Sequence, residues 1–185
     1  MRTWTNQDKT GWGDGPWVSE FDKAQWVDEA TGLDCLIVRG PVGALCGYVG
    51  VPPEHPWHGI SYSGKMNPDE GEYDYESAPD GNVEVHGGLT YSDSCWEDAP
   101  EGTGICHIPE AGRPADVWWF GFDTAHHMDL APMMIMHERE MDERLVRKGR
   151  EPIGLIGSTF PQFYRTVEYV KSEITSLAAQ LAAVA

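Results

Sequence analysis

The stretch DCLIVRGPVGALCGYVGV, residues 34–51, contains two β-prone runs on either side of Gly40-Pro41-Val42-Gly43. Isoleucine, valine, leucine and tyrosine suit a pleated, half-buried surface, whereas a short connection of glycine and proline favours a turn. Two such runs joined by a short turn are typical of a β-hairpin. The sequence therefore predicts an antiparallel pair of strands here, and this is its strongest β signal.

Further strands are indicated downstream of this hairpin. The segment DVWWFGFD predicts a strand from Val117 to Phe122 that ends at Asp123. Residues 82–92, NVEVHGGLTYS, alternate and then break at Gly87-Gly88, which indicates a strand with a bulge or a close approach of another segment to the backbone. The segment GICHIPE predicts a short strand around Ile105. We therefore expect a mostly antiparallel sheet.

The C-terminal third of the chain changes character and predicts helices. Residues 133–149 are charged and contain no proline or glycine before Gly149, as expected of a helix. In the final segment, apolar residues recur at spacings of three and four, which indicates one buried helical face formed by Val167, Val170, Ile174, Leu177 and Leu181. The predicted fold class is α+β, a mostly antiparallel sheet with C-terminal helices packed on it.

The length of 185 residues suits one domain, so we expect a single domain over residues 1–185. Residues 1–32 are rich in turns and are expected to wrap around a core that later segments build. Residues 52–80 are rich in Pro, Gly, Asp, Glu, Ser and Tyr without helical or strand periodicity, which predicts a long loop or excursion. Loops of this length often carry function.

Acidic residues outnumber basic ones by 30 to 13, giving a formal net charge of −17. Such a surface repels a phosphate backbone, so extended nucleic acid is not an expected partner, although a small anionic ligand or a basic protein partner is compatible with it. The sequence has no signal-like apolar core at its start and no apolar run of eighteen residues, so we expect a soluble, cytoplasmic protein without a membrane partner. Four scattered cysteines are expected to be free structural thiols.

The stretch VWWFGFDTAHHMDLAP, residues 117–132, passes abruptly from a core-like to a site-like composition. Asp123, His126 and Asp129 could supply two carboxylates and an imidazole at a strand end, with His58 and His86 arriving from neighbouring connections. Zinc, manganese or magnesium uses such ligands, and a bound metal lowers the pKa of its water so that hydroxide forms near neutral pH. The alternative is that an aspartate after the strand caps the next helix and that a histidine in this turn hydrogen-bonds to the backbone.

Aromatic residues favour the binding of a small ligand. Trp57, Tyr91, Trp118 and Trp119 could stack on a base while Arg165 meets a phosphate or carboxylate. The two adjacent tryptophans point to opposite faces if they lie on a strand, and core packing is the alternative role for either. The residues expected to bind a ligand are Trp57, His58, His86, Tyr91, Asp123, His126 and Arg165, and those expected to bind a divalent metal, if one is used, are Asp123, His126 and Asp129.

The chain contains the segments GWGDGPW, CGYVGV followed by PPEHPWHG, VHGGLTYS, WWFGFD-x-AH-x-x-DL-x-P and YRTVEYVKSEITSLAAQL. Together they resemble an uncharacterised protein family of tailed phages and actinobacterial genomes. The likeness covers nearly the whole chain. It implies a phage-related, cytoplasmic setting, the host cytoplasm if the gene is phage-encoded, and it implies no reaction.

In that setting, the expected function is to bind a small molecule and to sequester a nucleotide-derived immune signal as an anti-defence protein, by analogy alone. The alternative is a metal-dependent hydrolase or phosphodiesterase acting on a small nucleotide, and a purely protein-binding role ranks third. The sequence contains no G-x-S-x-G, P-loop, H-E-x-x-H or dinucleotide motif, so it leaves open whether the protein is an enzyme. It also leaves open association into a homo-oligomer.

Overall fold

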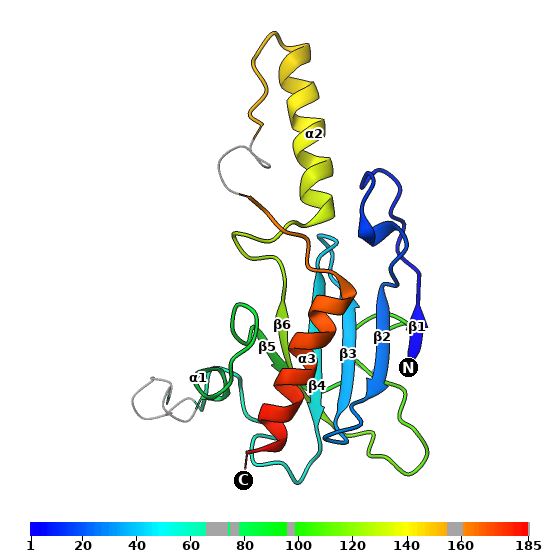
Figure 1. Ribbon diagram of the computed structural model, residues 1–185, viewed down its shortest axis with the longest axis vertical. Helices are drawn as coiled ribbons and strands as arrows, with labels where there is room; N and C mark the ends of the chain where they lie inside the picture. The colour runs from blue at the N-terminus through cyan, green and yellow to red at the C-terminus, as the bar shows by residue number, and fades with distance from the viewer. Residues whose placement is uncertain (66–73, 75–77, 96–98, 155–160, 185) are drawn as a thin grey trace.

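A six-stranded antiparallel sheet forms the body of the protein (Figure 1). The computed structural model describes residues 1–65, 74, 78–95, 99–154 and 161–184. Neighbouring strands follow the order β1-β2-β3-β4-β6-β5. The strands are β1 (Arg2–Trp4), β2 (Lys23–Val27), β3 (Asp34–Arg39), β4 (Leu45–Val51), β5 (Tyr91–Asp93) and β6 (Trp118–Asp123), and the helices are η1 (Pro16–Val18), α1 (Pro79–Asn82), α2 (Pro132–Arg147) and α3 (Val167–Ala182). The predicted α+β class is confirmed.

The predicted hairpin forms the centre of the sheet. Strands β3 and β4 pair from Asp34 with Gly50 to Arg39 with Leu45, and the Gly43 amide closes the turn on the Gly40 carbonyl at 3.0 Å. On its other side β4 pairs antiparallel with β6, so that Val51 lies opposite Trp118. The segment after β4 therefore leaves the sheet where β6 begins, and the segment after β6 leaves it at the other end. This register decides which loops can meet.

Helix α3 covers one face of the sheet, as Figure 1 shows, and its predicted apolar stripe is buried there. The side chain of Thr166 caps its first turn by accepting a hydrogen bond from the Tyr169 amide. Five stripe residues are at most 6% exposed: Val167, Val170, Ile174, Leu177 and Leu181. They pack on β3, β4 and β6, and Gly47 lets α3 approach β4 because a Cβ there would lie 2.8 Å from the Ile174 side chain.

The other face of the sheet carries a smaller apolar layer under the segment before β6. Leu36, Tyr48, Val117 and Trp119 are buried there, and the His107 ring lies 5.3 Å from the Trp119 ring. Trp118 instead packs with the α3 side, so the two tryptophans do face opposite sides of the sheet as predicted.

Two of the four cysteines form a disulfide, Cys95–Cys106, and the prediction of four free thiols is therefore wrong for this pair. Folding brings residues eleven positions apart together, which sequence spacing alone does not indicate. Cys35 and Cys46 are free, as predicted. Burial raises the pKa of Cys35 to about 12 and that of Cys46 to about 11, so both are inert protonated thiols near neutral pH.

Helix α2 forms where the sequence predicts it but extends away from the sheet (Figure 1). Only Pro132 at its start is buried, and Met134 and Met141 are 51% and 47% exposed. Charged residues are frequent along this helix, in HEREMDER, which leaves it less apolar side-chain area to bury than α3 has. Among the described residues, no helix is both long and apolar enough to cross a membrane.

Some predicted strands do not form, because side chains bond to the backbone in place of a neighbouring strand. The amides of Glu84 and His86 donate to the side chains of Gln180 and Glu173 on α3, so residues 82–86 are not a strand. The Ile105 region is also not a strand, since the Lys23 ammonium binds the carbonyls of Thr103 and Cys106. Conversely, β1 and β2 form within residues 1–32, where only a wrapping segment was expected.

The described part of the predicted long loop, residues 52–65, 74 and 78, is without strand or helix, and α1 begins at its end. Residues 66–73 and 75–77 of that loop lie outside the described residues.

A buried arginine ties the sheet to the segment that enters α3. All five N–H groups of Arg39 are used, on Asp22, Glu20, Tyr164 and the carbonyls of Phe21 and Gly43. Glu20 in turn accepts hydrogen bonds from the Tyr164 hydroxyl and the Val167 amide. The residues around Tyr164 are therefore held against the sheet.

Candidate functional site

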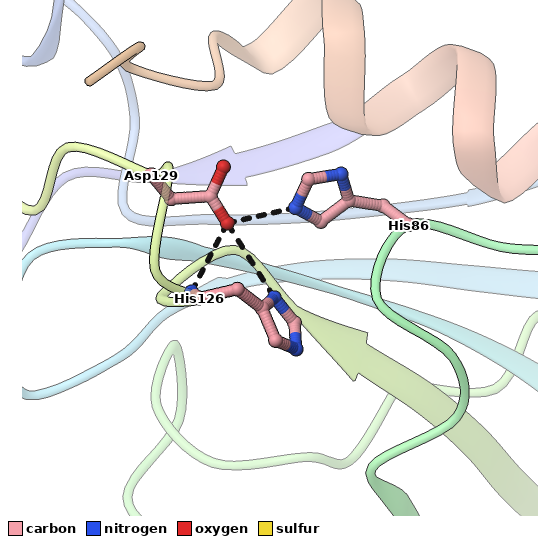
Figure 2. Close-up of side chains that lie close together, drawn as sticks. All are labelled: His86, His126 and Asp129. Atoms are coloured by element: carbon pink, nitrogen blue, oxygen red, sulfur yellow. Dashed lines mark hydrogen bonds and ion pairs between the residues drawn. The ribbon is translucent and has the colours of Figure 1, made fainter. Parts of the chain in front are cut away.

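Three segments that are distant in the sequence meet beyond the end of β6 (Figure 2). The turn after β6 supplies His126 and Asp129, the loop before β5 supplies His86, and the start of α3 supplies neighbouring side chains. The turn is anchored at both ends. The Thr124 hydroxyl donates to the Leu45 carbonyl at 2.8 Å, and the Leu130 amide donates to the Phe163 carbonyl at 3.0 Å.

The Asp129 carboxylate is the centre of the cluster, with a side chain only 1% exposed. Its Oδ2 accepts hydrogen bonds from His86 Nε2 at 2.8 Å and from the His126 amide at 3.1 Å, and its Oδ1 accepts one from Arg165 Nε at 2.7 Å. Burial alone would raise the pKa of Asp129, but the bonds from Arg165, His86 and the His126 amide outweigh it and hold that pKa below its usual value. The carboxylate is therefore ionised near neutral pH.

The tautomer of His86 follows from its two partners. Because an ionised carboxylate can only accept, the proton lies on Nε2, which faces Asp129. In the neutral ring Nδ1 then accepts the hydroxyl hydrogen of Tyr169, at 2.9 Å. Asp129, His86 and Tyr169 thus form a chain of two hydrogen bonds that polarise each other.

The ring of His126 is the open side of the cluster. Its side chain is 36% exposed, and its ring centre lies 5.4 Å from that of His86. Nδ1 is buried without a hydrogen-bond partner and lies 3.4 Å from Asp129 Oδ2. The ring rests against the backbone of Gly87, where a Cβ would lie 2.2 Å from Cε1. The close approach predicted at Gly87-Gly88 is therefore confirmed.

Two residues of α3 belong to the site and were missed in the sequence. Tyr169 bonds to the His86 ring, and the Glu173 carboxylate accepts a hydrogen bond from the His86 amide at 2.8 Å. Arg165, Tyr169 and Glu173 are spaced by four residues, which places them along one side of the chain as it enters and forms a helix. That polar spacing beside the apolar stripe was the signal that could have found them.

His86 Nε2, His126 Nδ1 and Asp129 Oδ2 have the composition of a two-histidine, one-carboxylate metal site. The three atoms lie within 4.8 Å of one another, and ligand atoms around a tetrahedral zinc are about 3.3 Å apart. For His86 Nε2 to bind a metal, its 2.8 Å contact with Asp129 would have to open slightly and the ring proton would have to lie on Nδ1, where it would donate to the Tyr169 hydroxyl. Outer partners are present, since Tyr169 holds the other nitrogen of His86 and Arg165 holds the other oxygen of Asp129.

Asp123, which the sequence predicts as a metal ligand, lies at the edge of this group. Its Oδ1 accepts the Ala125 amide at 2.9 Å, as a turn-capping aspartate does, and is 3.9 Å from His126 Nδ1. His86 takes its place among the three converging ligand atoms.

The remaining predicted ligand-binding residues lie elsewhere. Trp57 packs beside Phe120, and the His58 ring lies near Trp118 and Asp116, at the beginning of β6. Tyr91 packs against Tyr48 on the sheet face opposite α3. The structure therefore brings together His86, Asp123, His126, Asp129 and Arg165, and places Trp57, His58 and Tyr91 away from them.

Comparisons of the chain with protein-family models, with curated proteins and with solved structures found no match.

Proposed function

We propose that His86, His126 and Asp129 bind one divalent transition metal and that the protein uses it to hydrolyse a small anionic ester. The observation that carries this proposal is the convergence of three ligand atoms, one of which, His126 Nδ1, is buried without a hydrogen-bond partner. The site contains three carboxylates, those of Asp123, Asp129 and Glu173, and one guanidinium, that of Arg165. The net charge at the site is therefore negative and attracts a cation. A bound metal would supply hydroxide from its water near neutral pH.

Metal analysis tests the first half of this proposal. We expect about one zinc ion per chain after loading and dialysis, measured by mass spectrometry, and we expect His126→Ala to lose it. His137→Ala is the matched control, because His137 is an exposed histidine on α2. Tyr169→Phe should retain the fold and weaken zinc binding by about 10- to 100-fold, as outer-partner changes do. Zinc content that is equal in His126→Ala and in the wild type contradicts the site.

Turnover tests the second half. Zinc-loaded protein is expected to hydrolyse bis(p-nitrophenyl) phosphate or p-nitrophenyl phosphate for more than one turnover, and Asp129→Asn is expected to abolish this activity. Failure of both substrates in a protein that holds zinc would favour capture over hydrolysis.

Capture without consumption is the second candidate, because Asp129, His86 and Arg165 are already linked without a metal. A protein that lacks metal and releases an unchanged small ligand on heating would support it. The anti-defence setting, the nucleotide-derived signal and the cytoplasmic location are proposals that rest on the sequence resemblance.

A further inference from the structure

Phe163 presents an uncovered aromatic ring beside the metal-ligand cluster. Phe163 is 53% exposed, although its backbone is fixed. Its amide donates to the Met128 carbonyl and its carbonyl accepts the Leu130 amide, both at 3.0 Å. Phe163 is also the bridge partner of Asp129. A rigid backbone thus holds an apolar ring in solvent next to a site residue.

The same short segment directs Arg165 to the site. Side chains alternate along an extended chain, so Tyr164 turns inward to Arg39 while Phe163 and Arg165 share the outer side. The Arg165 guanidinium lies 5.9 Å from the Phe163 ring centre and 4.8 Å from that of Tyr169. Its Nε is bonded to Asp129, and its two terminal amino groups make no hydrogen bond to any described residue. They form a fixed pair of donors for an oxyanion.

We propose that this site takes a phosphate ester that carries a flat unsaturated ring, with the phosphoryl oxygens on Arg165 and the ring on Phe163. The inference rests on the proposed metal site for the reaction but not for these two contacts. A phosphoryl group has several oxygens, so one can meet the guanidinium while another faces the three ligand atoms. The net charge of −17 disfavours long polyanions, so the ligand is small.

Two phosphonates that differ only in the ring test the contact with Phe163. Phenylphosphonate and methylphosphonate cannot be hydrolysed at their P–C bond, and their binding to zinc-loaded protein can be measured by calorimetry. We expect phenylphosphonate to bind about tenfold more tightly, as a stacked ring does. Phe163→Ala should reduce that ratio to about one, whereas Phe163→Tyr should keep it. AMP and ribose 5-phosphate form a second pair whose ring lies farther from the phosphate.

A ring preference in either pair that is lost in Phe163→Ala supports the proposal. Met134→Ala, which shortens an exposed apolar side chain on α2, is the control and should change nothing. A preference that survives in Phe163→Ala, equal binding within both pairs, or no saturable binding of any probe at millimolar concentration overturns it.

Zinc content, measured separately, keeps the two proposals apart. Protein without zinc that still shows a Phe163-dependent ring preference contradicts the metal site and supports the ring contact. Protein that binds zinc but shows no ring preference supports the metal site and contradicts the ring contact.

Discussion

Gly87 has no side chain, and the imidazole of His126 occupies the space beside it that a Cβ would fill. We expect Gly87→Ala to lower zinc affinity by at least about tenfold, because the added methyl displaces a proposed ligand, and displaced ligands cost affinity on this scale or more. Calorimetry with zinc measures the change.

Gly59→Ala provides a control for backbone strain. Gly59 has φ +77°, close to the +71° of Gly87, but among the described residues no atom beyond its two chain neighbours lies within 4 Å of its added Cβ. Both variants should lose similar stability from the positive φ, and only Gly87→Ala should lose zinc. Equal zinc affinity in the two variants would show that His126 does not bind the metal.

Asp22 is one of two carboxylates that pair with the buried Arg39. The two side chains are 1% and 0% exposed, Oδ1 of Asp22 lies 3.0 Å from Arg39 Nε and 2.8 Å from Lys9 Nζ, and Oδ2 accepts the amides of Asn6 and Gln7. Asp22→Asn should therefore lower the free energy of unfolding by about 3–5 kcal/mol at pH 7, because it removes one partner of a buried pair. Asp116→Asn, whose side chain is 74% exposed, should change it by less than about 0.5 kcal/mol.

The effect of Asp22→Asn should also depend on pH. Burial alone would raise the pKa of Asp22, but the Lys9 ammonium and two amides lower it below the usual value. The ionised carboxylate then contributes stability that is fully present above about pH 4 and is lost as the pH falls through the lowered pKa. Urea unfolding at pH 7 and below pH 4 should show the gap between wild type and variant shrinking in acid. A constant gap would mean that the charge of Asp22 is not responsible.

At the scale of elements, local patterns predicted what local interactions determine. The hairpin of β3 and β4, strand β6 and helix α3 have apolar periodicities that suffice to indicate them. Strands β1 and β2 exist because β3 offers an edge on which to pair, and this long-range cause leaves little signal in a turn-rich segment. The alternating residues 82–86 lack such an edge, since side chains of α3 bind their amides instead.

Truncating an apolar side chain should destabilise the protein on helix α3 but not on helix α2. Leu177 on α3 is fully buried against the sheet, so Leu177→Ala should lower the free energy of unfolding by about 2–5 kcal/mol. Met141 on α2 is 47% exposed, so Met141→Ala should change it by less than about 0.5 kcal/mol. Chemical denaturation of both variants gives the comparison, and a large loss in Met141→Ala would mean that α2 is covered in solution.

At the scale of the whole molecule, strand pairing decides which predicted site residues meet. Asp123, His126 and Asp129 were named because they follow a predicted strand, His86 because it lies in a neighbouring connection, and Arg165 because it could meet an anion. These five residues do gather beyond the end of β6. Trp57 and His58 follow β4, and since β4 runs antiparallel to β6 they emerge at the beginning of β6 instead. The sequence showed which residues follow strands, but it did not contain the β4–β6 register that separates the two groups.

The two faces of the sheet should respond independently to reduction of the Cys95–Cys106 disulfide. This bond fixes the segment whose His107 ring packs on Trp119, on the sheet face opposite α3 and the proposed metal site. Opening the short loop that it closes should lower the free energy of unfolding by about 2–3 kcal/mol.

We expect tris(2-carboxyethyl)phosphine to cause this loss in the wild type and not in the double variant Cys95→Ser/Cys106→Ser, which should already be less stable by the same amount. Zinc affinity should change by less than about twofold in both, because His107 and Trp119 lie on the sheet face opposite α3, whose Tyr169 bonds to the proposed ligand His86. A parallel loss of zinc binding on reduction would show that the two faces are coupled through the sheet.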